Sequence, residues 1–206
     1  MKFIGITGGV GAGKSAILSH LSQKYNCKII MADDLAKNLM EPETQCFSQI
    51  VSKLVSNGFV KSESELLDSN GNLDKSVMSQ VVFASDEGRA MVNAIVHPAV
   101  KDWVLCDVEH ERKKGEIDYY FFEAALMLEC DYDKVCDEVW YIFTSEENRR
   151  ARLKENRGYS DDKVDNIFAS QLTEEEFRSR CKFVVDNNFS PQESFEQIDE
   201  YLTINI

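Results

Sequence analysis

Residues that loosen a chain are scarce in this sequence. Glycine occurs 10 times and proline 3 times in 206 residues, and neither gathers into a segment that would make a flexible linker. Hydrophobic residues make up 43% of the chain, which is enough for one sizeable core. We therefore expect residues 1–206 to form a single domain and not a series of linked modules.

Positive charge is also in short supply. Lysine and arginine number 23 against 36 aspartates and glutamates, so the net charge is -13. An acidic surface repels phosphate backbones and anionic lipids, which makes nucleic acid and membranes poor partners. No apolar run approaches the roughly 20 residues that span a bilayer, and the N-terminal segment reaches glycine too early for a signal peptide. These absences favour the cytoplasm.

The six cysteines form no metal-binding or redox pattern. None stands in a Cys-x-x-Cys pair, and none has a histidine at the spacing of a zinc site. We expect them to be buried thiols of a reduced, cytoplasmic protein.

Five apolar segments have the length and composition of buried strands. They begin at Lys2 (KFIGIT), Lys28 (KIIMA), Tyr119 (YYFFEAA), Glu138 (EVWYIFTS) and Lys182 (KFVVDN). Nearly continuous apolar strands that alternate with helices are typical of a parallel sheet covered on both faces. The sequence therefore predicts an α/β fold built as a three-layer sandwich, with the aromatic run of the third segment in its core.

Helical patterns fill most of the remaining chain. We expect helices within 15–25, 34–58 and 74–114, the last one broken at His97-Pro98. Serine or threonine followed three residues later by glutamate is the signature of a capping box. Three such boxes are predicted, at Thr144/Glu147, Thr173/Glu176 and Ser190/Glu193.

The stretch GITGGVGAGKS at 5–15 joins the first predicted strand to the first predicted helix. Gly8 to Ser15 match the pattern G-x-x-x-x-G-K-S/T at every position. Glycine lets backbone N–H groups approach phosphate oxygens, and the helix start turns its positive end toward the same anion. Lys14 can reach the β- and γ-phosphates, and the Ser15 hydroxyl can ligate Mg²⁺. The predicted nucleotide site comprises Gly9, Val10, Gly11, Ala12, Gly13, Lys14, Ser15 and Ala16.

Two aspartates, Asp33 and Asp34, come directly after the second predicted strand. Ligands bind at this edge of an open α/β sheet. A carboxylate there can accept the proton of an alcohol while Lys14 and Mg²⁺ hold the γ-phosphate, which is what a kinase needs. The same two residues are also typical of a helix cap, and both interpretations stay open at this point.

Arginine is unevenly distributed. Six of the eight arginines lie between positions 149 and 180. In an acidic protein such a cluster suggests a local anion-binding region, although a solvated helix face that pairs with its own glutamates explains some of these arginines as well.

Taken in order, these motifs resemble one family, the dephospho-coenzyme A kinases. TGGVGAGKS resembles its phosphate loop, and MADDLA at 31–36 resembles its D-A-D-x-x-A motif. NGNLDK and VNAIVHPAV resemble its coenzyme-binding helical region, and EAALMLE at 123–129 resembles its P-L-L-x-E element. The arginine cluster, Gln171 and VVDNN resemble its lid and last strand. The resemblance covers nearly the whole chain.

The resemblance implies an activity and an architecture. ATP, with Mg²⁺, would phosphorylate the ribose 3′-hydroxyl of dephospho-coenzyme A to give coenzyme A and ADP. The chain would be a P-loop kinase with strand order 2-3-1-4-5, a helical substrate subdomain near 60–115 and a lid near 146–180. Its partners would be ATP and dephospho-coenzyme A, and its oligomeric state is left open.

The resemblance also implies roles for single residues. Asp33 would be the catalytic base, Lys14 would stabilise the transferring phosphoryl group, and Ser15 would hold Mg²⁺. Arg157 would be the lid arginine that closes over the phosphates. The remaining implied contacts are those of Asn187 near ATP and of Lys75, His97 and Glu129 with the acceptor. For Asn187, His97 and Glu129 a purely structural role is the alternative.

Four positions depart from the family pattern. Met31 replaces the first aspartate of the D-A-D motif, and Ala125 replaces the proline of the P-L-L-x-E element. Ala16 follows Ser15 where threonine is common. Lys75 stands where arginine is typical, which keeps the charge but loses the bidentate fork.

Three other functions remain as alternatives. Another small-molecule or nucleotide kinase could use the same scaffold, and only the resemblance at 92–100 argues against it. A nucleotide-dependent switch would carry guanine-recognition residues such as N-K-x-D, which are absent, and would have no use for Asp33. A catalytically inactive relative is disfavoured because Lys14, Ser15 and Asp33 are all present.

Overall fold

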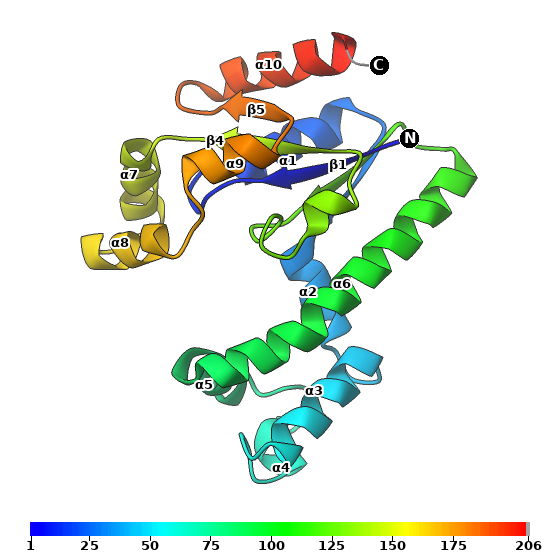
Figure 1. Cartoon of the computed structure of the whole chain (residues 1–206), viewed down its shortest axis with the longest axis vertical. Coiled ribbons are helices and arrows are strands. Elements are labelled where there is room, and N and C mark those ends of the chain that lie inside the picture. The colour runs from blue at the N-terminus through cyan, green and yellow to red at the C-terminus, as the bar shows by residue number, and fades with distance from the viewer. Residues whose placement is uncertain (205–206) are drawn as a thin grey trace. The chain divides into compact units, whose positions relative to one another are not determined.

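A computed structural model describes residues 1–204 of the chain. These residues form two compact units (Figure 1). The sheet unit comprises Met1–Met31 and His110–Ile206, and the helical unit comprises Ala32–Glu109.

Five parallel strands form the sheet of the sheet unit. They are β1 (Lys2–Thr7), β2 (Cys27–Met31), β3 (Tyr119–Glu123), β4 (Glu138–Phe143) and β5 (Phe183–Asp186). The strand order is β2-β3-β1-β4-β5, so the predicted strand number, direction and order are all confirmed. The strand that enters the phosphate loop, β1, therefore lies at the centre between β3 and β4.

Alternate residues along each strand supply the two buried faces of this sheet. On one face Ile4, Phe121 and Trp140 pack against α1 (Lys14–Lys24) and α10 (Pro191–Ile204). On the opposite face Tyr141 stacks on Phe177 of α9 (Glu174–Arg180), with ring centroids 4.6 Å apart. The three-layer sandwich is confirmed, and Tyr120, Phe121 and Phe122 are buried in its core as expected.

Two further helices follow β4, and serine caps both of them. Ser145 accepts a hydrogen bond from the third residue of α7 (Glu146–Arg157), and Ser160 does the same for α8 (Asp161–Ala169). The capping box predicted at Thr144/Glu147 is therefore wrong by one position. The hydroxyl of Thr144 instead donates to the backbone oxygens of residues 12 and 187.

The other two predicted capping boxes are confirmed. Thr173 and Glu176 exchange both reciprocal hydrogen bonds at the start of α9. Ser190 and Glu193 do so at the start of α10.

The helical unit contains α2 (Ala32–Leu39), α3 (Gln45–Ser56), α4 (Glu63–Leu66) and α5 (Lys75–Ala84). The single helix predicted over 34–58 is thus two helices. The chain turns at 40–44 because Pro42 lacks a backbone N–H for a helical hydrogen bond, Glu43 takes a left-handed φ of 71°, and the Thr44 hydroxyl caps α3.

A long helix, α6 (Asp86–Lys114), runs through Pro98, so the break predicted at His97-Pro98 is wrong. Proline removes one backbone hydrogen bond of the helix. The buried side chains of Val96, Val100 and Val104 hold the helix on both sides of this position, and tertiary packing outweighs the local penalty. The break lies instead at Ser85, where the backbone is extended.

Two further observations bear on the expectations from composition. Within residues 1–204 no helix combines the length and the apolar character that crossing a membrane would require. All six cysteines are free thiols, but only Cys46 and Cys181 are buried, and Cys106 is exposed.

Candidate active site

The phosphate loop leads from the end of β1 into α1. Gly13 takes a left-handed φ of 87°, and a Cβ at this position would collide with the amide of Asn187, so only glycine fits. No side chain caps the start of α1, and its first turn carries no acidic residue. The backbone N–H groups of this turn, with the positive end of the helix, therefore suit a bound anion.

Lys14 lies folded over its own loop. Its Nζ donates a hydrogen bond to the carbonyl oxygen of Gly8 at 2.7 Å and lies 3.6 Å from Oε1 of Glu123. Glu123 is the last residue of β3 and is buried, with 8% of its surface exposed. A phosphate that binds in the loop would compete for the same ammonium group.

Glu123 belongs to the site although the sequence interpretation did not select it. One sequence feature could have identified Glu123: it is a carboxylate at the end of an apolar strand. That strand, β3, pairs with β1, the strand that leads into the phosphate loop. In the motif at 123–129 the sequence interpretation assigned a substrate contact to Glu129 and not to Glu123. The structure places Glu129 on an exposed turn after β3, and its predicted contact with an acceptor stays a prediction.

The oxygen donors at the loop suit a magnesium ion. Mg²⁺ prefers hard oxygen ligands and is usually held by one or two protein oxygens together with substrate phosphates. The Ser15 hydroxyl and the Glu123 carboxylate are such donors. Among the described residues no cluster of three or more histidine, cysteine, aspartate or glutamate side chains could hold a metal by itself.

Arg149 of α7 packs directly on the phosphate loop. Its Nε donates to the carbonyl oxygen of Val10 at 2.9 Å, and a second guanidinium nitrogen donates to Oε1 of Gln171. The ring of Phe168 lies over the guanidinium with 4.3 Å from Cζ to its centroid. A Cβ on Gly9 would collide with the same guanidinium, so any larger residue at this position would displace Arg149 from the loop.

The charge of Arg149 has no carboxylate partner among residues 1–204. The residue is 9% exposed, and no carboxylate of the described residues lies within 4.0 Å of its guanidinium. Burial lowers the pKa of Arg149, and the electrostatic effects of Tyr141 and Glu146 offset this only in part. A buried cation held against a phosphate loop without a carboxylate partner is suited to a negatively charged ligand.

A second set of contacts fixes the loop at Ala12. The carbonyl oxygen of Ala12 accepts hydrogen bonds from Asn187 Nδ2 at 2.7 Å and from the Thr144 hydroxyl at 3.1 Å. Arg152 donates to the backbone oxygen of Asn187 at 2.8 Å, and Ser194 donates to its side-chain oxygen at 2.8 Å. Asn187 is thus adjacent to the loop, and both ends of its amide group are engaged by protein. Its predicted contact with ATP stays a prediction.

Arg157, the predicted lid arginine, lies apart from these contacts. It is the exposed last residue of α7, before Gly158. Its hydrogen bond to Tyr159 lowers the pKa of that phenol. The arginines that contact the loop are Arg149 and Arg152. Nothing local distinguishes them within EENRRARLKENR, so the sequence interpretation selected neither.

The predicted acceptor residues Asp33, Lys75 and His97 all belong to the helical unit. Asp33 and Asp34 form the first turn of α2, and both are exposed. Asp34 pairs with Lys37 at 2.7 Å. Within the described residues Asp33 has neither a hydrogen-bond nor an ion-pair partner, so its carboxylate is available to a ligand.

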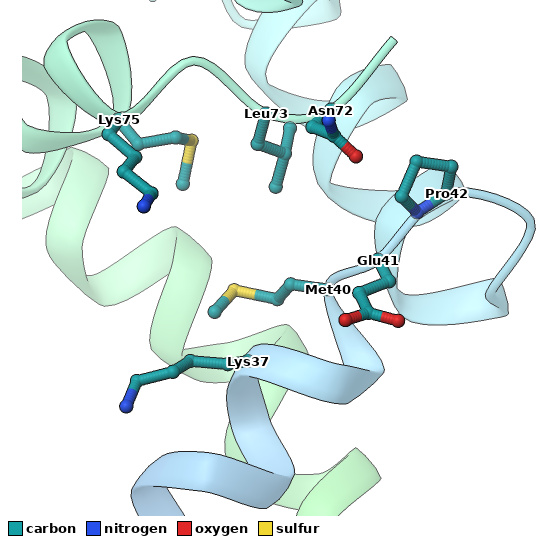
Figure 2. Close-up of a pocket in the computed structure, with 8 residues that line it drawn as sticks. Lys37, Met40, Glu41, Pro42, Asn72, Leu73 and Lys75 are labelled. Atoms are coloured by element: carbon teal, nitrogen blue, oxygen red, sulfur yellow. The ribbon is translucent and has the colours of Figure 1, made fainter. Parts of the chain in front are cut away.

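A pocket of about 260 Å³ opens between the end of α2 and the start of α5 (Figure 2). Lys75, the first residue of α5, borders this pocket as an exposed side chain. The other residues that border it are Lys37, Met40, Glu41, Pro42, Asn72, Leu73 and Met78.

His97 lies elsewhere in the helical unit, halfway along α6. Burial lowers the pKa of its imidazole, so the ring is neutral at pH 7 and is no fixed positive charge. The next residue, Pro98, borders a second cavity of about 420 Å³. A contact of His97 with substrate stays a prediction.

Comparisons of sequence converge on one family. The family model described as Dephospho-CoA kinase matches residues 2–193. A Dephospho-CoA kinase of Geobacter sulfurreducens is 30% identical over 200 residues, which cover 97% of this chain and 96% of the relative. Another, of Symbiobacterium thermophilum, is also 30% identical and is covered over 79% of its length.

Solved structures share the fold at lower identity. A Thermus thermophilus protein superimposes with a TM-score of 0.77 at 24% identity, over 100% of this chain and 97% of that one. A Dephospho-CoA kinase from Campylobacter jejuni gives 0.70 at 22% identity, over 100% of both chains. Shikimate kinase from Acinetobacter baumannii gives 0.54 at 11% identity, over 100% of this chain and 94% of that one.

The fold and the phosphate loop define a kinase of the P-loop class, because a central parallel strand feeds a complete loop whose lysine and serine open the following helix. Within that class the match over residues 2–193 decides the family. The chain belongs to the dephospho-CoA kinase family.

Proposed function

We propose that this chain transfers the γ-phosphate of ATP to the ribose 3′-hydroxyl of dephospho-CoA and so forms CoA and ADP. The observation that carries this proposal is the family match over residues 2–193, on a chain that retains the loop lysine and serine. Another small-molecule kinase is the alternative, and the sequence relatives do not favour it, because those compared are all named Dephospho-CoA kinase.

The sheet unit binds the donor. The N–H groups at the start of α1 and the ammonium group of Lys14 receive the β- and γ-phosphates of ATP. Lys14 must leave the Gly8 oxygen and Glu123 to do so, which lets the phosphates take over an already desolvated charge. Arg149 adds a second cation beside the loop.

Ser15 and Glu123 are the residues that would hold Mg²⁺ together with the phosphates. When bound, the ion neutralises charge on the β- and γ-phosphate oxygens. The buried position of Glu123 at the end of the strand beside the phosphate-loop strand, 3.6 Å from Lys14, supports this assignment.

The helical unit binds the acceptor, and Asp33 is its base. The oxygen of the 3′-hydroxyl forms a bond to the γ-phosphorus while the bond from that phosphorus to the bridging oxygen of ADP breaks. Asp33 accepts the hydroxyl proton, and ADP leaves with the bonding electrons. The carboxylate of Asp33 is free for this role, whereas Asp34 is engaged by Lys37.

Water must be kept from the γ-phosphate for transfer to outrun hydrolysis. We assign this to α7, α8 and α9, which would carry Arg157 over the phosphates when ATP binds. We also place the reaction in the cytoplasm, which the six free thiols support.

Release of ADP tests the proposed function. Purified protein with Mg-ATP should form ADP much faster when dephospho-CoA is added, with CoA as the second product by mass spectrometry. The matched control is the 3′-deoxy analogue of dephospho-CoA, which lacks only the accepting hydroxyl and should compete without being phosphorylated. Stimulation by another alcohol but not by dephospho-CoA would leave a kinase and remove this substrate.

A further inference from the structure

We infer that the pocket between α2 and α5 holds the pantetheine arm of the acceptor, with Lys37 and Lys75 at its diphosphate. The inference rests on the proposed function, since it concerns the same substrate. It adds which part of the helical unit distinguishes dephospho-CoA from a simpler nucleoside that carries the same hydroxyl.

The spacing of Asp33, Lys37 and Met40 along the helical path of α2 matches the order of the parts of the acceptor. A helix rises about 1.5 Å per residue, so Lys37 lies one turn, about 6 Å, beyond Asp33, and Met40 lies about 10 Å beyond it. Met40 still donates its N–H to Ala36, which keeps it on the helical path. The acceptor presents its parts in the same order: the 3′-hydroxyl, then the 5′-diphosphate, then the arm.

The pocket also carries positive charge that suits a diphosphate. Lys37 and Lys75 both border the pocket, and in the view of Figure 2 their ammonium groups lie on the same side of it. Lys75 makes no ion pair within the described residues. Lys37 is shared with Asp34, but both partners of that pair are largely exposed, so a diphosphate can displace it at little cost.

The helix start at Lys75 adds little to this attraction. Asp74 already accepts the N–H groups of Ser76 and Val77 at the first turn of α5. The anion would therefore be recognised by the lysine side chains and not by the helix terminus.

The pocket lining beyond the two lysines suits the pantetheine arm. It is mainly apolar, from Met40, Pro42, Leu73 and Met78, which suits the geminal methyl groups and methylenes of pantetheine. Glu41 and Asn72 add polar groups that can pair with its amides. The volume of about 260 Å³ is below the roughly 300–1,000 Å³ of pockets that enclose a whole ligand, so it suits one arm of a larger molecule.

The cavity beside Pro98 in the helical unit fits this ligand less well. Its lining, which includes Gln45, Cys46 and Trp103, contains the carboxylate of Asp102 but no lysine or arginine. A diphosphate would find no cation there and would face a negative charge.

The test uses 4′-phosphopantetheine, which contains the arm and one phosphate but no nucleoside. It should inhibit the full-length wild-type kinase competitively against dephospho-CoA and not against ATP. No inhibition at concentrations well above the KM for dephospho-CoA, or competition with ATP, would overturn the inference.

Pocket variants then locate the inhibitor. Lys75→Ala should raise both the inhibition constant of 4′-phosphopantetheine and the KM for dephospho-CoA about ten-fold, since a charge-assisted contact is lost, while the KM for ATP stays unchanged. Lys75→Arg should restore most of the affinity. Leu73→Asp should weaken the inhibitor by a similar factor. Lys53→Ala, an exposed lysine of α3 that does not border the pocket, is the matched control.

The outcomes separate this inference from the proposed function. If the wild type does not phosphorylate dephospho-CoA, the proposed function fails. If the wild type is active and the pocket variants keep wild-type constants for 4′-phosphopantetheine and dephospho-CoA, only the pocket assignment fails. Circular dichroism of each variant shows whether it is folded. If Leu73→Asp does not fold, Lys75→Ala still tests the inference, because Lys75 is exposed.

Discussion

The side-chain amide of Asn187 donates a 2.7 Å hydrogen bond to the backbone oxygen of Ala12, across 175 residues of sequence. This bond ties the end of β5 to the middle of the phosphate loop. The Thr144 hydroxyl, at the end of β4, donates to the same oxygen at 3.1 Å. The loop is therefore shaped by residues from two neighbouring strands as well as by its own glycines.

Replacing Asn187 with alanine should damage both stability and ATP binding. The change removes the hydrogen bonds that the Asn187 amide makes with the buried Ser194 hydroxyl and with the Ala12 oxygen, which costs about 1–3 kcal/mol of the free energy of unfolding. The Ser194 hydroxyl keeps its bond to the backbone oxygen of Asp186. The freed Ala12 segment should also raise the KM for ATP about ten-fold, because the N–H groups of the loop are no longer preorganised. Urea unfolding and initial rates measure the two effects. Asn166→Ala, on the exposed face of α8, should change neither. A stable, loosely binding variant would show that the anchor serves function alone, whereas an unchanged KM would contradict this prediction.

Replacing Arg149 with methionine should separate stability from catalysis. Its buried charge has no carboxylate partner within the described residues, so the desolvation penalty that its removal relieves offsets the lost hydrogen bonds to Val10 and Gln171. We therefore expect the free energy of unfolding to change by less than about 1 kcal/mol. The same change should lower kcat/KM for ATP about a hundred-fold, since a preorganised cation beside the transferring group is lost.

The next residue of α7 offers a matched control for this prediction. Arg150 forms its ion pairs with Asp161 and Asp165 on the surface, away from the phosphate loop. Arg150→Met should therefore stay close to wild type in both measurements. Equal losses of activity in the two variants would mean that Arg149 acts only through the packing of the lid helices.

The sheet could be predicted because its information is local. Strands such as EVWYIF are apolar at nearly every position, and only a strand buried on both faces needs that pattern. The phosphate loop could also be predicted locally, because every residue type that phosphate binding requires lies within Gly8–Ser15. The strand order came from the resemblance to a family and not from the strands themselves.

The errors and omissions depend on contacts that are distant in sequence. The sequence pattern predicts Thr144 as a helix cap, but in the structure its hydroxyl donates a hydrogen bond to the backbone oxygen of Ala12. Pro98 should end a helix, but buried valines on both sides keep α6 continuous. Arg149 and Arg150 are identical neighbours in sequence, and only the fold turns one toward the loop and the other toward α8. Such choices cannot be made from propensity or spacing.

Asp33 and Asp34 allow a direct test of the catalytic base. Asp33→Asn removes the proton acceptor and should lower kcat by about 10²–10⁴, the range of general base catalysis, with the KM for ATP unchanged. Asp34→Asn makes the same chemical change one residue away, but removes only the exposed ion pair with Lys37 and should keep kcat near wild type. Rates of CoA formation under saturating ATP measure both. If the two variants lose the same factor, or if Asp34→Asn loses more, Asp33 is not the base.

Stability should fall in acid because of Asp199, which joins α10 to α1. It accepts hydrogen bonds from Lys24 and Tyr25, both at 2.6 Å, and is paired with His20 at 2.8 Å. Burial alone would raise the pKa of Asp199, but these partners outweigh it and lower the pKa to about 2. The unfolded chain therefore binds a proton first as the pH falls below about 4, and the contribution of Asp199 is lost between about pH 4 and pH 2.

Urea unfolding of wild type and Asp199→Asn at several pH values measures this contribution. At pH 7 the carboxylate is fully ionised, and we expect the variant to be less stable by about 2 kcal/mol, the equivalent of the lowered pKa. The gap should shrink between pH 4 and pH 3 as the unfolded wild type takes up its proton. Asp165→Asn, which removes a surface ion pair of α8, should show a difference below about 1 kcal/mol at every pH. A gap for Asp199→Asn that stays constant down to pH 3 would mean that shape and packing at this position, and not its charge, hold α10 against α1.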